Sequence, residues 1–166
     1  MLKYELQSIL SGTRQVSQGA LIQTITRHLG RSAPTSPMAQ DEQQNKHQEK
    51  EKLIAYATKH NLWVSSIDFE GFISAGAEQR VFIKGDRYVY KLNDAIYYAS
   101  WIDYFDSLLL NNFFFPDTAY NLLGFHLEED ILFAVVMQPY VKADTPTEIS
   151  EVKKFMKNNG FENTRN

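Results

Sequence analysis

Cysteine, histidine and serine are the residue types whose spacing most often reveals catalytic or metal chemistry, and none of them forms such an arrangement here. The sequence contains no cysteine, which excludes disulfides, thiolate metal sites and cysteine nucleophiles. No histidine and aspartate are suitably placed to activate any of three serines as a nucleophile: Ser11, Ser17 and Ser74. The histidines fall on separate predicted elements, with no pair at ligand spacing: His28, His47, His60 and His126. A metal enzyme and a hydrolase are both disfavoured.

Lys91 and Gly76 are the remaining candidates for chemistry, and each also has an ordinary structural explanation. Lys91 follows a β-rich segment, where a lysine can lay its aliphatic stem over apolar neighbours. Gly76 lies between two predicted strands and can be a simple turn glycine. Residue type and position alone leave both interpretations open.

The elements that would position these residues predict an α+β fold. From Trp63 onward, runs rich in Val, Ile, Phe and Tyr predict three strands, and a hairpin over residues 81–91 turns at Gly85-Asp86. Apolar residues at helical spacing predict a helix from about Ile96 to Asn112. Residues 119–125 and 132–140 then predict a second hairpin. We therefore expect a five-stranded antiparallel sheet with one long packed helix.

Helices are also expected at both ends of the chain. Residues 1–30 predict a helical hairpin that Gly30 ends, and residues 31–62 predict a linker followed by a polar, partly solvated helix. Thr145-Pro146-Thr147-Glu148 has the pattern of a helix start, and Gly160 closes that helix.

Composition limits the possible partners. The chain has 166 residues, a net charge of -3 and 43% hydrophobic residues, which suits one globular domain with an appendage. No broad cationic field exists for nucleic acid, and no apolar run approaches the ~18 residues of a membrane span. The N-terminus lacks the apolar core of a signal peptide, so we expect a cytoplasmic protein with neither nucleic acid nor membrane as a partner.

Two segments resemble the nucleotide-binding strands of protein kinases. Residues 72–81 resemble the first hairpin, with Gly76 in the place of the middle glycine of the phosphate-covering turn and Val81 in that of the adenine-capping valine. Tyr88-Val-Tyr-Lys91 resembles the third strand, whose lysine pairs with the α- and β-phosphates. The resemblance implies ATP as the ligand, with Ala77 and Glu78 in the covering loop.

The segment over residues 132–141 resembles the fifth kinase strand running into the hinge. The resemblance puts Met137 in the gatekeeper place and implies that main-chain groups near Gln138 and Tyr140 contact adenine. Asp117-Thr-Ala-Tyr120 and Gly160-Phe-Glu-Asn163 resemble the kinase-like domain found in polyvalent proteins of bacterial mobile elements. The likeness extends from Trp63 to Arg165 and implies an N-lobe over residues 63–141. Residues 142–166 would then be the hinge and the start of a missing C-lobe.

The chain departs from the kinase pattern in ways that bear on catalysis. Ser74 and Gln79 stand where the outer glycines of the loop would be. No C-helix glutamate matches the partner that kinases give the lysine, so Asp106, ahead of Asp103 and Glu78, is the expected partner of Lys91.

Nothing after Tyr140 matches the catalytic-loop residues or the metal-binding aspartate of kinases. We therefore expect a nucleotide-binding lobe that is not competent alone. A C-lobe in cis or in trans would complete it, and magnesium would bind only with that lobe. The alternative is a noncatalytic protein-interaction module with a degenerate kinase-lobe fold, and either protein could self-associate.

Overall fold

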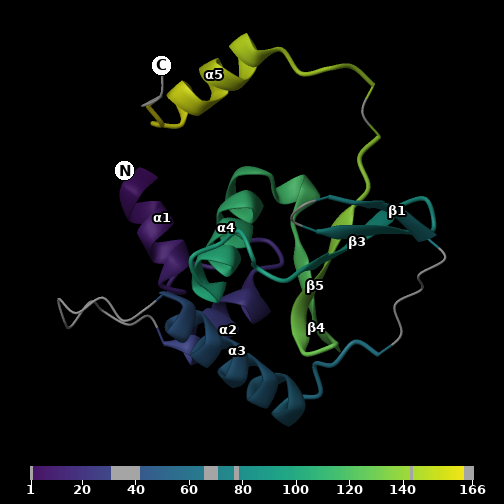
Figure 1. Ribbon diagram of the computed structural model, residues 1–166. Helices are drawn as coiled ribbons and strands as arrows, with labels where there is room; N and C mark the ends of the chain where they lie inside the picture. The colour runs from purple at the N-terminus through teal and green to yellow at the C-terminus, as the bar shows by residue number, and fades with distance from the viewer. Residues whose placement is uncertain (1, 31–41, 66–70, 77–78, 143, 163–166) are drawn as a thin grey trace.

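The computed structural model describes residues 2–30, 42–65, 71–76, 79–142 and 144–162, whose arrangement Figure 1 shows. Three helices come first: α1 (Leu2–Leu10), α2 (Ala20–Leu29) and α3 (Glu42–Lys59). The strands are β1 (Phe72–Ala75), β2 (Arg80–Lys84), β3 (Tyr88–Asn93), β4 (Asn121–Glu128) and β5 (Ile131–Pro139). Helix α4 (Trp101–Phe114) and the short 3-10 helix η2 (Pro116–Thr118) connect β3 to β4, and α5 (Ile149–Asn158) comes last.

One antiparallel sheet contains the strands in the order β1-β2-β3-β5-β4. The predicted α+β class and antiparallel sheet are therefore confirmed. Gly30 and Gly160 follow α2 and α5 with φ of 75° and 81°, in the left-handed region that glycine enters without strain. Among the described residues, no helix combines the length and the apolar composition needed to cross a bilayer.

Helices α4 and α5 both begin later than the sequence pattern predicts. Helix α4 begins at Trp101 instead of Ile96 because Ser100 caps it, its side chain accepting the Asp103 N–H at 3.0 Å. Helix α5 begins at Ile149, and its N-cap, Glu148, makes no side-chain capping bond. Residues 144–148 are exposed, so no packing supports the extra turn that the pattern around Thr145 predicts.

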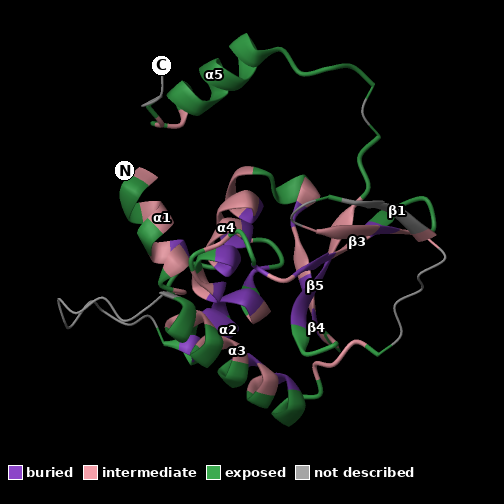
Figure 2. Ribbon diagram, in the orientation of Figure 1, coloured by how far each residue is buried: buried purple, intermediate pink, exposed green. Residues whose placement is uncertain are grey.

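Helix α4 lies between the sheet and the N-terminal helices, as Figures 1 and 2 show. One apolar core joins all three layers, and its members include Ile9, Ile22, Ile25, Leu53, Phe105, Leu109, Phe125 and Val136. Such a core ties the N-terminal helices to the sheet by burial of apolar surface. The helical hairpin of residues 1–30 thus shares its core with the sheet.

A smaller apolar cluster covers the other face of the sheet. It contains Phe82, Leu92, Phe133 and Val135. The guanidinium of Arg80 lies 4.4 Å from the centre of the Phe133 ring and forms a 2.7 Å ion pair with Glu128. The hydrogen bond from Arg80 lowers the pKa of the Glu128 carboxyl. The sheet thus has two distinct faces, and only one of them packs against α4.

Candidate functional site

Lys91 points to the face of the sheet that packs against α4. In the strand register, Lys91 lies opposite Val81 on β2 and opposite Val136 on β5. Directly paired residues in an antiparallel sheet share a face, and Val136 belongs to the core under α4. Val89, two residues earlier on β3, is on this face as well. The sheet therefore brings the predicted Lys91 and Val81 together.

Tyr120, which directly precedes β4, is the partner of Lys91. The Lys91 Nζ donates a hydrogen bond to the Tyr120 Oη at 3.1 Å and lies 5.0 Å from the centre of the tyrosine ring. A phenol combines a neutral acceptor with a π face that attracts a cation. Among the described residues, the contact that holds the lysine is thus with a neutral phenol.

Asp106 lies on the far side of α4 from the cavity that this helix forms with the sheet. The α4 residues that line the cavity are Tyr104, Ser107, Leu108 and Asn111. At about 100° per residue, Asp106 is roughly half a turn away from them. The prediction that Asp106 pairs with Lys91 is replaced by the observed Tyr120 contact, and Asp103 is an exposed residue of the first turn.

The turn between β1 and β2 is open at Gly76. Its N–H donates to the Gln79 carbonyl at 3.0 Å, and among the described residues an added Cβ would meet only that carbonyl, at 4.0 Å. As far as the described residues go, Gly76 therefore has room for a small side chain. Ala77 and Glu78, which the sequence assigned to the covering loop, lie outside the described residues.

The end of β5 differs from the predicted hinge by one strand position. Met137 pairs with Tyr90, whereas Gln138 pairs with Val89, so Gln138 instead of Met137 is on the Lys91 face. The Gln138 side chain donates to the Thr118 carbonyl at 2.7 Å. The Tyr140 N–H, expected to be available for adenine, donates to the Arg87 carbonyl at 2.7 Å.

Asn112 fixes the backbone of Tyr120 to α4. Its Oδ1 accepts the Tyr120 N–H at 2.7 Å, and its Nδ2 donates at 2.9 Å to the carbonyls of Tyr120 and Ser17. Asn112 itself is 1% exposed, whereas Tyr120 is half-buried and Ser17 is exposed, so the three bonds are partly shielded from water. Asn112 thereby connects the segment between α1 and α2 to the residue that holds Lys91.

Helix α3 contacts the connection between β3 and α4 through charged residues that sequence reasoning treated as solvated. The Lys46 ammonium donates to the carbonyls of Ala95 and Tyr98. The Glu49 carboxylate accepts the Trp101 N–H at 2.7 Å, at the start of α4. No sequence signal marks these contacts, because their partners are main-chain groups some fifty residues away.

Glu49 should contribute to the stability of the fold by accepting the Trp101 N–H. Replacing it with alanine removes an acceptor at the N-terminus of α4, where the helix dipole favours negative charge, and should lower the free energy of unfolding by about 1 kcal/mol. Glu49→Gln keeps an acceptor oxygen and should be milder. Urea unfolding of both variants tests this ordering.

The same residue predicts a pH dependence. Burial raises the pKa of the Glu49 carboxyl above 4.5, with Asp103 adding to the rise and the Trp101 N–H opposing it. Since the folded state then binds the proton more tightly, the stability contributed by Glu49 falls as pH rises through the interval just above the ordinary pKa. Glu49→Gln should therefore gain stability relative to wild type as the pH rises above the ordinary carboxyl pKa. If the stability difference between Glu49→Gln and wild type does not change with pH, this prediction is wrong.

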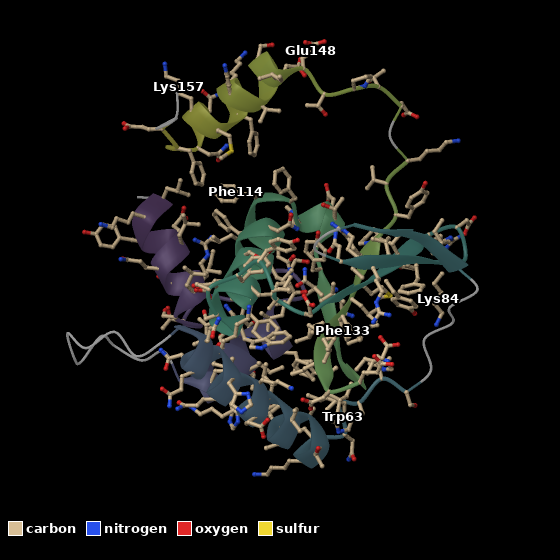
Figure 3. All side chains as sticks on the ribbon, in the orientation of Figure 1. Trp63, Lys84, Phe114, Phe133, Glu148 and Lys157 are labelled. Atoms are coloured by element: carbon tan, nitrogen blue, oxygen red, sulfur yellow. The ribbon has the colours of Figure 1, made fainter. Side chains whose placement is uncertain are left out.

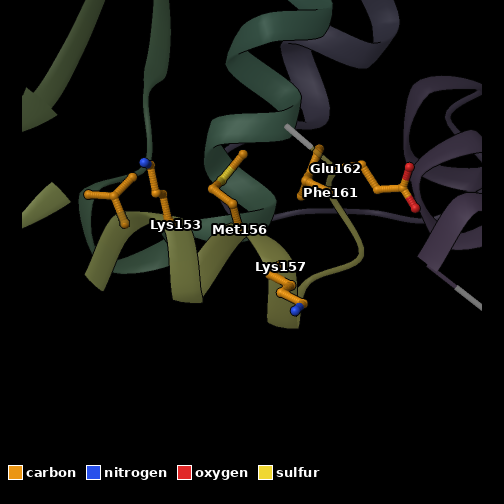
Figure 4. Close-up of a pocket in the computed structure, with 6 residues that line it drawn as sticks. Lys153, Met156, Lys157, Phe161 and Glu162 are labelled. Atoms are coloured by element: carbon orange, nitrogen blue, oxygen red, sulfur yellow. The ribbon is translucent and has the colours of Figure 1, made fainter. Parts of the chain in front are cut away.

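Helix α5 packs onto the end of α4 through aromatic rings. The Phe155 ring stacks on Phe115 with centroids 5.6 Å apart, and the Phe161 ring meets Phe114 at 5.4 Å. Figure 3 shows Phe114 at the end of α4 that faces α5. A hollow of about 740 Å³ lies beside α5, and the six residues that line it, drawn in Figure 4, are Val152, Lys153, Met156, Lys157, Phe161 and Glu162. This hollow is far larger than the cavity of about 210 Å³ next to Tyr120.

The described residues do not fit a metal ion. No group of three or more histidine, aspartate or glutamate side chains among them is arranged as a ligand set.

The comparison with family models places this protein in the class of kinase-like domains. The chain belongs to the family described as serine/threonine/tyrosine kinase found in polyvalent proteins, whose model matches residues 46–166. The match begins within α3, upstream of the predicted start at Trp63, so the helix that caps α4 is part of the family domain. Searches among curated proteins and among solved structures gave no match.

Proposed function

We propose that this chain is the nucleotide-binding lobe of a kinase-like domain and that ATP is its ligand. The observation that carries the proposal is the common face of Lys91, Val81 and Val89 beside the open turn at Gly76. The strand order, with α4 between β3 and β4, is the order expected of a kinase N-lobe. Family membership supports the same assignment.

Different residues of this face would contact different parts of ATP. Lys91 would bind phosphate oxygens, because a charge-assisted hydrogen bond to an ammonium is among the stronger polar contacts. The turn at Gly76 would cover the phosphates, and the apolar side chains of Val81 and Val89 would contact the adenine. Gln138 would face the base at the end of β5. When bound, ATP supplies the phosphoryl group that kinases transfer.

A second lobe is part of the proposal. The cavity of about 210 Å³ beside Tyr120 is smaller than the ~300–1,000 Å³ typical of ligand pockets, so the described residues form one wall of a nucleotide site. A C-lobe, in cis or in trans, would supply the other wall and the carboxylates that bind metal. We derive no catalytic step from this chain's residues, since the described part contains no metal ligand set.

Calorimetric titration with ATP tests the proposal. We expect weak saturable binding in the millimolar range, and Lys91→Ala should lower the affinity about tenfold or more, since hydrogen bonds to charged groups contribute about 1.5–3 kcal/mol. Gly76→Ala is an informative companion, because a Cβ fits at this position and the fold should tolerate it. A lower affinity with unchanged stability would place the Gly76 backbone close to the phosphates.

The result of the ATP titration also decides between a nucleotide-binding lobe and a noncatalytic interaction module. No heat of binding at millimolar ATP, with a folded chain, would favour the noncatalytic interaction module. An observation that supports the module is the exposed apolar face of α5, where Ile149, Val152 and Met156 are 70%, 46% and 39% exposed. The same face would serve a C-lobe equally well, so the titration is the deciding measurement.

A further inference from the structure

A polar cavity lies between α4 and the sheet. Its volume is about 210 Å³, and its wall comes from several parts of the chain. Gln79 follows the Gly76 turn, Tyr104, Ser107 and Asn111 lie on α4, and Tyr120 precedes β4. The cavity is partly open to solvent and its lining is mostly polar, so it suits water or a polar ligand.

Asn111 has a buried donor with no acceptor. Its Nδ2 is shielded from solvent and makes no hydrogen bond to any of the residues that the structure describes. More than nine-tenths of buried polar groups in native proteins have a partner, and a buried donor without one destabilises the fold. Asn111 also lines the cavity, which has room for an acceptor.

The wall of the cavity contains both donors and acceptors, since the Ser107 hydroxyl donates to the Tyr104 carbonyl and keeps its oxygen as an acceptor. Tyr120 accepts from Lys91, so its own O–H is directed elsewhere. Burial raises the pKa of the Tyr104 phenol, with the nearby Tyr98 and Tyr120 adding to the rise, so that hydroxyl stays neutral and can donate. None of the described residues that line the cavity is acidic. Lys91 adds positive charge behind Tyr120, so the site favours a ligand with negatively charged oxygens.

We propose that this cavity binds a small oxyanion, a phosphate or carboxylate group, held by the Asn111 side-chain amide and the Tyr120 hydroxyl with Lys91 behind it. The volume holds a group of this size with a few waters, at about 30 Å³ each, and is too small for a whole nucleotide. The oxyanion can be a free ion or the end group of a larger ligand. The site is distinct from the adenine-facing surface and can exist without nucleotide binding.

Asn111→Leu is the test of the cavity itself. Leucine fills part of the space and removes the unpaired donor, so the melting temperature of the free protein should rise by about 2–4 °C. The neighbouring Asn112→Leu makes the same chemical change on the same helix, which controls for the difference in helix propensity, and should lower the melting temperature. A lower melting temperature for Asn111→Leu would mean that water already satisfies the amide, and the proposal would fail.

Ligand binding is tested with inorganic phosphate and with acetate at matched ionic strength. NMR of the wild-type protein should show saturable shifts of the Asn111 side-chain amide signals, and Asn111→Leu should abolish the thermal stabilisation by phosphate. Unmoved signals at tens of millimolar anion, a concentration far above the Kd of a useful site, would overturn the proposal.

A competition experiment identifies the source of the oxyanion. If ATP displaces phosphate and shifts the Asn111 amide, the natural ligand is a nucleotide phosphate. If adenosine and phosphate bind independently, it is a free anion, and either pattern supports the site. Phosphate binding without any ATP binding would leave this site intact while refuting the nucleotide-lobe function.

Discussion

Replacing Asn112 with leucine should lower the free energy of unfolding by about 3 kcal/mol, because partly buried main-chain groups lose their partners and leucine leaves them facing an apolar side chain. The Tyr120 N–H and the Tyr120 carbonyl bind the same amide, at 2.7 and 2.9 Å, and leucine can replace neither bond. The Ser17 carbonyl, released as well, belongs to an exposed residue and can regain water. Urea unfolding compares this variant with Asn111→Leu, which should be more stable than wild type.

Asn112→Leu should also weaken the hydrogen bond that Lys91 donates to Tyr120, although Asn112 does not contact Lys91. When Tyr120 is no longer fixed to α4, its hydroxyl loses the position from which it accepts the Lys91 hydrogen bond. We therefore expect weaker ATP binding under conditions in which the variant is still folded. A stability within 1 kcal/mol of wild type would show that Asn112 does not fix this part of the site.

The elements that the sequence predicted well are those whose pattern is local. The hairpin of β2 and β3 follows from two β-rich arms around Gly85-Asp86, and α4 follows from apolar residues repeating at helical spacing. These signals extend over about twenty residues or fewer. The helix starts were less accurate, because caps such as Ser100 compete with the alternative starts that a pattern offers.

The parts of the site that were missed depend on distant contacts or on a shift of one residue. Tyr120 is 29 residues from Lys91, and only the connection through η2 brings the phenol to the lysine. Asp106 satisfied a rough spacing rule but lies on the wrong side of its helix. Met137 and Gln138 exchange faces with a one-residue difference in register, which a single sequence does not fix.

Charged residues on α3 show a second limit. Lys46 and Glu49 have the composition of an exposed helix, and a solvated face is the usual explanation. Both instead bind main-chain groups at the start of α4, and this role becomes visible only when the loop before Trp101 is placed. The family match that begins at residue 46 agrees with a role for this helix within the domain.

Gly124→Ala should be the second severe substitution, lowering the free energy of unfolding by about 3 kcal/mol or more. A Cβ at this position would collide with the carbonyl of Leu62, a main-chain group that cannot rotate away. The φ of Gly124 is 151°, which L side chains rarely adopt. The register of β4 against β5 shifts between Leu122 and Gly124, so glycine also permits this irregularity.

The collision would separate two segments that Gly124 allows to touch. The Phe125 N–H donates to the Leu62 carbonyl, and the Val64 N–H donates to the Phe125 carbonyl, both at 2.8 Å. Relief of the clash requires these bonds to break, which frees the chain just after α3 from the sheet. Gly76→Ala is the matched control, since a Cβ fits there, and its stability should stay near that of wild type.

Hydrogen exchange should then be faster in Gly124→Ala at the start of α4, because α3 caps that helix through Glu49 and has lost its attachment to β4. Faster exchange confined to β4 would mean that α3 holds its place on α4 without the sheet.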